Sequence, residues 1–102
     1  MKVEWTAPAI DDVLAIKSYI GRDSPAYADR FADRMIEAAE SLVSLPRRGR
    51  VVPEANDETI RELLFGNYRI IYRLENERVL LLTILHGARN LTALEPKPWE
   101  LA

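Results

Sequence analysis

The segment Tyr68–Arg89, with the sequence YRIIYRLENERVLLLTILHGAR, decides the fold. Polar residues 75–77 predict a short turn between two strands, and residues 78–86 are apolar on both faces, which is typical of a strand inside a sheet. Side chains alternate along a strand, so Arg69 and Arg73 project from one face of the first strand. The opposite face carries Tyr68, Ile70, Tyr72 and Leu74. The pattern predicts a hairpin with fixed positive charge on one side, which suits an anionic partner.

The residues before this hairpin predict a strand followed by two helices. Residues 2–5 alternate in polarity, and Thr6 is the expected N-cap of a helix that ends at Gly21. Ser24 is the expected N-cap of a second amphipathic helix that Pro46 ends. The link between the helices is so short that they must fold back on each other as an antiparallel hairpin.

The whole pattern predicts an α+β fold. An irregular connection over residues 46–58 leads into a strand over 59–65, and this strand and the Tyr68–Arg89 hairpin form a three-stranded antiparallel meander. The helical hairpin is expected to cover one face of a mostly antiparallel sheet, which leaves Arg69 and Arg73 displayed on the open face. Residues 91–102 are expected to form either a frayed extension or a strap.

Composition predicts one ordinary globular domain over residues 1–102. The chain is 48% hydrophobic and 29% charged, and it contains no cysteine. The first residues lack the apolar run of a signal peptide, and the longest apolar stretch, residues 79–85, is too short to span a bilayer. We therefore expect a cytoplasmic protein that neither enters a membrane nor depends on a disulfide, a metal or a cofactor.

Charge is unevenly distributed along the chain. The net charge is −2, which does not favour nucleic acid as a partner of the whole molecule. Residues 1–45 hold five Lys or Arg against eight Asp or Glu, whereas residues 46–102 hold nine against eight. Eight of those nine cations are arginine, whose planar donor fork suits carboxylate or phosphate.

Several motifs together resemble the RelE/ParE superfamily of toxins from bacterial type II toxin–antitoxin modules. The resemblance spans nearly the whole chain, in the order and spacing of the family. The matching motifs are Trp5 before the helix that opens with Ala9-Ile10-Asp11-Asp12, Tyr19-Ile20, the segment from Leu45 to Glu54, Ile60-Arg61-Glu62-Leu63, Tyr68 to Arg73, and His86-Gly87-Ala88-Arg89. The fold of the family is the strand and helix order already predicted from the pattern of the residues.

The resemblance implies one of two activities. RelE-like members are ribosome-dependent mRNA endonucleases, whereas ParE-like members share the fold and poison DNA gyrase. Members of both branches are neutralised by a cognate antitoxin, itself usually DNA-binding, whose acidic extended segment wraps the toxin. The resemblance therefore implies an antitoxin as partner and no sequence-specific DNA binding by the toxin alone.

The nuclease alternative would use a specific set of residues. Metal-free RNA cleavage needs an acid, a base and cations around the phosphorane. The candidates are Arg61, Glu62, Arg69, His86 and Arg89. The RelE nucleases have two lysines on the strand before the Tyr-Arg motif and a tyrosine after the last arginine. Arg61 and Leu63 stand at the lysine positions here, and no tyrosine follows Arg89.

The departures from the RelE pattern and the net negative charge favour the ParE branch. The preferred hypothesis is a toxin that inhibits DNA gyrase by binding, without chemistry of its own, through Arg69, Arg73 and Arg89. The alternatives are a ribosome-dependent endoribonuclease and a remnant that binds its antitoxin and little else. Simple structural roles also stay open: His86 as a strand-end residue, Arg69 or Arg89 as an ion-pair partner of Glu62, and Arg47, Arg48 and Arg50 as solvated charges.

Overall fold

A computed structural model describes residues 1–100 of the chain. The helices are α1 (Ala7–Gly21) and α2 (Pro25–Glu40), and the strands are β1 (Lys2–Trp5), β2 (Arg50–Val51), β3 (Ile60–Phe65), β4 (Tyr68–Leu74) and β5 (Arg78–His86). The strands form one sheet in the order β1-β5-β4-β3-β2, in which β1 runs parallel to β5 and the other pairs are antiparallel. This arrangement confirms the α+β prediction, the three-stranded meander and the interior position of β5.

The predicted helix starts are confirmed by their caps. The Thr6 hydroxyl accepts a hydrogen bond from the Ala9 N–H at 3.3 Å, and the Ser24 hydroxyl accepts one from the Tyr27 N–H at 3.2 Å. The predicted end of the second helix at Pro46 is wrong. The α-helix ends at Glu40 and tightens into a 3-10 turn, Ser41–Val43, before Pro46 is reached. None of the helices within residues 1–100 has the length and apolar character needed to cross a membrane.

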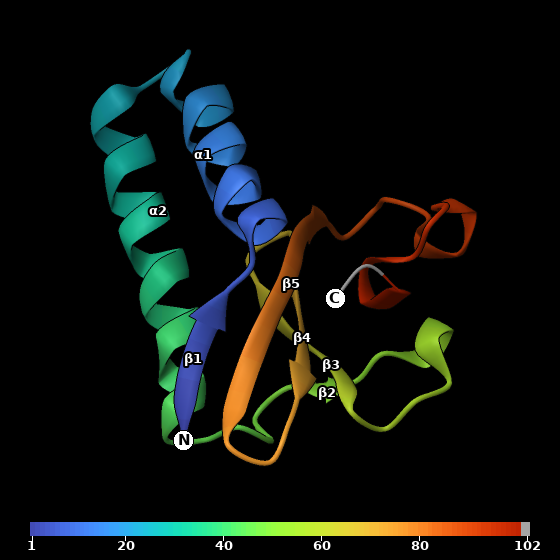
Figure 1. Cartoon of the computed structure of the whole chain (residues 1–102). Coiled ribbons are helices and arrows are strands. Elements are labelled where there is room, and N and C mark those ends of the chain that lie inside the picture. The colour runs from blue at the N-terminus through green and yellow to red at the C-terminus, as the bar shows by residue number, and fades with distance from the viewer. Residues whose placement is uncertain (101–102) are drawn as a thin grey trace.

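The helical pair covers one face of the sheet (Figure 1). As predicted, Ile70 and Tyr72 of β4 are fully buried on this face, with Tyr68 and Leu74 partly buried beside them. The other large members of this core are Val13, Met35, Leu42, Leu63, Val79, Leu81 and Ile84. The two short helices are therefore held by an apolar layer shared with β3, β4, β5 and β1.

The second face of the sheet is also covered, so the expectation of an open arginine face is wrong. Figure 1 shows the C-terminal segment and the connection after β2 on the side of the sheet away from the helices. A second core lies beneath them, made of Val52, Ile60, Ile71, Leu80, Leu82, Leu85 and Leu91, with Ala55, Leu94 and Trp99 packed against it. The tail is thus a strap as far as residue 100, while residues 101–102 lie outside the described part of the chain. The connection over 46–58, expected to be irregular over most of its length, contains the two-residue strand β2 and a 3-10 turn, Pro53–Ala55.

Candidate functional site

A buried ion pair joins the central strands beneath the strap. Glu62 of β3 and Arg69 of β4 lie on the sheet face that turns away from the helices. The Glu62 side chain is 0% exposed and the Arg69 side chain 10%, and the Nε of Arg69 donates a hydrogen bond to Oε1 of Glu62. Burial of two charges is costly unless both are paired and hydrogen-bonded, so this contact offsets part of the cost of burying the two side chains.

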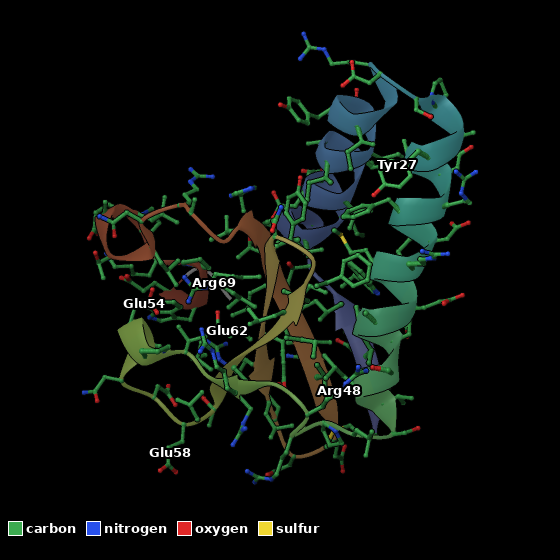
Figure 2. All side chains as sticks on the ribbon, turned by 180° about the vertical axis from the view of Figure 1, so that it is seen from behind. Tyr27, Arg48, Glu54, Glu58, Glu62 and Arg69 are labelled. Atoms are coloured by element: carbon green, nitrogen blue, oxygen red, sulfur yellow. The ribbon has the colours of Figure 1, made fainter. Side chains whose placement is uncertain are left out.

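Two residues of the 50–58 region complete the network. Both terminal nitrogens of Arg69 donate hydrogen bonds to the Glu54 carboxylate, Nη1 to Oε2 at 3.1 Å and Nη2 to Oε1 at 3.0 Å. The Nε of Arg50 donates to the second oxygen of Glu62 at 2.7 Å. Figure 2 shows Glu54, Glu62 and Arg69 gathered together between the sheet and the 3-10 turn that carries Glu54. Every nitrogen of the Arg69 guanidinium is therefore bound to a carboxylate.

The protonation of this network follows from its contacts. The hydrogen bonds from Arg69 lower the pKa of Glu54 below its ordinary value, and burial only partly opposes them. The hydrogen bonds to Glu54 and Glu62 raise the pKa of Arg69. The Arg69 guanidinium is thus held by two carboxylates and is not free to bind an anion.

A second network fixes the loop before β2. The buried Tyr72 hydroxyl donates to the Pro46 carbonyl at 2.7 Å and accepts from the Gly49 N–H at 3.1 Å. The Nη1 of Arg61 donates to the Gly49 carbonyl at 2.8 Å. Burial raises the pKa of Tyr72, while the Gly49 N–H and the nearby guanidinium groups of Arg61 and Arg47 act in the opposite direction. The hydroxyl therefore stays protonated and serves as a bridge.

The predicted site residues do not meet at one point. Arg61 stands opposite Tyr72 in the register of β3 and β4, so its side chain lies on the helix face, away from Arg69. Arg73 lies under the strap, where its Nη2 donates to the Trp99 carbonyl. Of the proposed target-binding arginines, only Arg89 is exposed; Arg69 is buried and Arg73 is half-buried.

His86 lies at the exposed end of β5. Its ring meets the Tyr68 ring edge to face, with 5.5 Å between the centroids, and its Nδ1 accepts the Ala88 N–H at 3.2 Å. His86 and Arg69 line the same shallow hollow beside the β3–β4 turn. The nitrogens of Arg69 are bound to carboxylates. His86 therefore shares this hollow with an arginine whose donors are already in use.

Sequence reasoning missed Glu54 and the role of Arg50. Glu54 stands in a largely irregular connection, where no periodicity of the sequence indicates the position of a carboxylate. One signal could have found it. Glu62 and Arg69 both lie in strand segments, and charged groups buried in a sheet need several partners, which predicts a further carboxylate near Arg69. Within residues 1–100 no three His, Cys, Asp or Glu side chains are grouped so as to hold a metal ion.

Comparison with known proteins identifies the family. Residues 3–91 match the family model of the ParE toxin of type II toxin–antitoxin systems, parDE. The chain belongs to the ParE toxin family. It is thus a type II toxin–antitoxin toxin within the RelE/ParE superfamily, as the resemblance in its motifs implied. A curated relative, Toxin RelE2 of Caulobacter vibrioides, is 40% identical over 89 residues, which are 86% of this chain and 97% of the relative.

Solved structures agree with the fold of this ParE family member. The chromosomal ParDE system from P. aeruginosa superposes with a TM-score of 0.71 at 21% identity and covers 84% of this chain and 95% of its own. The toxin–antitoxin complex RelBE2 from Mycobacterium tuberculosis gives a TM-score of 0.59 at 24% identity, covering 83% and 95%. At these identities the likeness shows the shared RelE/ParE fold.

Proposed function

We propose that this ParE family member inhibits DNA gyrase by binding to it, does not cleave RNA, and is neutralised by a cognate antitoxin. The observation that carries the proposal is the occupied guanidinium of Arg69. A nuclease needs this arginine to reach the charge that develops on a phosphorane. In this chain the two terminal nitrogens already bind Glu54 and the Nε binds Glu62, so a phosphate would have to displace two carboxylates.

The surroundings of Arg69 support the same reading. The strand position of the second RelE lysine holds Leu63, which is buried in the helix-side core and offers neither charge nor a proton. Arg61 is engaged with the Gly49 carbonyl on the other face of the sheet. General acid–base catalysis requires its groups within hydrogen-bond reach of one substrate, and these residues are distributed over two faces.

The partnership with an antitoxin is supported by the fold relatives and by one apolar groove. The two solved relatives are named as toxin–antitoxin systems or complexes. On this chain a groove of about 330 Å³, with almost no polar lining, is formed by Trp5, Ile10, Val13, Leu14 and Ile36. Ile10 and Leu14 are 46% and 58% exposed, one helical turn apart on α1. Such a groove suits the apolar face of a segment of the antitoxin.

The deciding experiment compares two reactions of the purified toxin. One is a gyrase supercoiling assay in which trapped gyrase–DNA breaks are counted; the other is a programmed translation reaction in which mRNA cuts are mapped by primer extension. We expect inhibition or trapped breaks with intact mRNA. Codon-positioned cuts would overturn the proposal and support the alternative of an mRNA endonuclease. One curated relative carries the name Toxin RelE2, which is why the nuclease is tested as the alternative. Neither effect, from toxin that binds its antitoxin, would identify a remnant.

Arg89→Ala and Arg30→Ala make a matched pair for the gyrase assay. Both arginines are exposed, and each substitution removes one charge without entering a core. If Arg89 contacts gyrase as an interface hot spot, its substitution weakens inhibition about 30-fold. Arg30, on the outer surface of α2, is expected to leave inhibition unchanged. Equal inhibition by both variants would remove Arg89 from the target-binding surface.

A further inference from the structure

A cleft lies between the first turns of α1 and the strap, across the C-terminal end of β5 (Figure 1). Its volume is about 260 Å³, and its walls are mainly apolar, formed by Pro8, Leu82, Leu85, Leu94, Pro96 and Pro98. Arg89, the exposed arginine of the proposed gyrase surface, is also part of the lining. The cleft therefore joins an apolar space to a cation that the proposed function uses.

The other polar groups of the cleft bind within the chain. One oxygen of Asp12 accepts the Thr83 hydroxyl at 2.5 Å and the Ile84 N–H at 2.9 Å. The Thr6 hydroxyl donates to a carbonyl of β5 at 2.7 Å. Within residues 1–100, by contrast, the Arg89 guanidinium makes no hydrogen bond or ion pair. The cleft is thus complementary to an apolar group that carries a carboxylate beside it.

The strap wall of the cleft is fixed before any partner binds. Leu91 is buried in the second core, and Leu94 and Trp99 pack against that core. The Trp99 carbonyl accepts a hydrogen bond from Arg73. Two of the residues that line this wall are prolines, whose rings fix one backbone torsion each. A wall already held in one conformation loses little entropy when a partner binds.

The volume and the charge of the cleft select a protein side chain as its occupant. Cofactors and drug-sized ligands fill sites of roughly 300–1,000 Å³, which is more than the volume available here. A nucleic acid is held by several phosphate contacts, whereas the described lining of this cleft contains the single cation Arg89, on a chain of net charge −2. One large apolar side chain with a neighbouring carboxylate satisfies both the walls and Arg89.

The cleft lies on the side of α1 opposite to the apolar groove proposed for the antitoxin. An α-helix turns by about 100° per residue, so residues two positions apart lie about 200° from each other around its axis. Pro8 and Asp12 of the cleft stand two positions before Ile10 and Leu14 of the groove. The two surfaces are therefore separate, and the cleft is left for a partner other than the segment in the groove.

We propose that this cleft is where the toxin binds DNA gyrase, with an apolar side chain of gyrase in the cleft and an adjacent Asp or Glu of gyrase paired with Arg89. The inference rests on the proposed gyrase inhibition and deepens it, because it names the kind of segment that is recognised. A side chain enclosed by apolar walls, with a charge pair at its edge, is typical of the few residues that dominate the binding energy of an interface.

Pro8→Glu tests the cleft, and Pro25→Glu is its matched control. Both prolines are exposed and stand in the first turn of a helix, where an acidic side chain is favourable, so both variants are expected to fold. Pro8→Glu places a negative charge in the wall of the cleft, which disfavours an apolar side chain and repels a carboxylate. We expect the toxin concentration that half-inhibits gyrase supercoiling to rise about 30-fold for Pro8→Glu, as for the loss of a dominant contact. Pro25→Glu should change it less than about threefold.

Two further measurements test whether Pro8 and Arg89 act on the same gyrase segment. In the double variant Pro8→Glu with Arg89→Ala, the two fold-changes should combine to less than their product, because both substitutions affect one shared partner. In the wild-type toxin, hydrogen exchange at the amides of residues 94, 95 and 97 should slow when gyrase is bound, while residues 21–24 at the tip of the helical hairpin stay unchanged. The second measurement needs no variant and therefore decides the question even if a substitution impairs folding.

The outcomes separate this inference from the function on which it rests. If the wild-type toxin does not inhibit gyrase, the proposed function fails and the cleft assignment fails with it. If the wild type inhibits gyrase and folded Pro8→Glu inhibits it equally well, or if exchange at residues 94–97 does not slow, only the cleft assignment is overturned. It is also overturned by a Pro8→Glu variant that still inhibits gyrase but loses affinity for the antitoxin or for a 20-base-pair DNA duplex, since the cleft would then belong to that partner.

Discussion

Arg69 donates the hydrogen of its Nε to Glu62, whose side chain is wholly enclosed between the sheet and the segments that cover it. The pair lies on neighbouring strands and closes a network that includes Glu54 and Arg50. Removal of one member of a buried pair leaves an uncompensated charge, which is much costlier than the loss of a surface contact. The arginine of the family motif is thus bound by carboxylates of its own chain, and we expect it to contribute to the stability of the fold.

Glu62→Gln tests this structural role. The substitution removes the charge that Arg69 and Arg50 share, and we expect the free energy of unfolding to fall by about 3 kcal/mol, at the lower end for a broken buried pair because Glu54 still holds Arg69. Urea denaturation at neutral pH measures the change. Glu58→Gln is the control, since Glu58 is exposed and points away from the cluster (Figure 2), and a surface change of this kind stays within about 0.5 kcal/mol. Equal effects of the two substitutions would show that the pair does not hold the sheet.

The Glu54 carboxylate gives the fold a dependence on acid pH. Its pKa is lowered in the folded protein, mainly by the hydrogen bonds from Arg69, so the folded state binds a proton less readily than the unfolded state does. Its contribution to stability is therefore present above the unfolded pKa of about 4.3 and is lost as the pH falls through that value toward the lower folded pKa. Between pH 6 and pH 3, the free energy of unfolding should fall less in Glu54→Gln than in the wild type.

The variant is expected to keep part of the acid slope. The pKa values of Glu4 and Asp57 are also lowered, Glu4 chiefly by a hydrogen bond from Lys2 and Asp57 chiefly by the Thr59 N–H. Both groups still gain protons in acid after Glu54 has been replaced. Parallel curves for wild type and variant would show that the Arg69 contact does not shift the titration of Glu54.

The sequence predicted the elements of this fold better than the environment of its charged residues. Helix caps and strand alternation are local properties, and they placed α1, the start of α2 and the helix-side face of β4 correctly. Whether Arg69 meets solvent depends on residues 52–55 and 91–99, which lie far along the chain and lack regular periodicity. The alternation identified the two faces of β4 correctly, but it carried no information about the strap that covers one of them.

Gly49→Ala should disturb the loop that leads into β2. The new Cβ would lie 2.5 Å from the Glu62 carbonyl oxygen and 2.7 Å from the Tyr72 hydroxyl, and neither belongs to a side chain end that moves freely. We expect a loss of about 1–3 kcal/mol in the free energy of unfolding, the usual cost of a forced overpacking. Gly21→Ala is the matched control, because its Cβ would meet only the Ala28 Cβ at an ordinary 3.7 Å. Thermal denaturation of both variants distinguishes crowding at Gly49 from the general effect of replacing glycine by alanine.

Trp99→Ala tests whether the C-terminal segment is part of the fold. The Trp99 side chain is half-buried against the second core, and its carbonyl accepts a hydrogen bond from Arg73. Replacement of a fully buried tryptophan costs about 3–5 kcal/mol, so we expect about 2 kcal/mol for this half-buried one. Because Trp99 anchors one part of the strap on the second core, hydrogen exchange should rise first at residues 91–100 and at the strands beneath them, before global unfolding. Tyr19→Ala, at a side chain that is 67% exposed, is the control and should leave both stability and exchange of the strap unchanged. A uniform rise in exchange across all strands would instead show that the strap and the sheet unfold as a single unit.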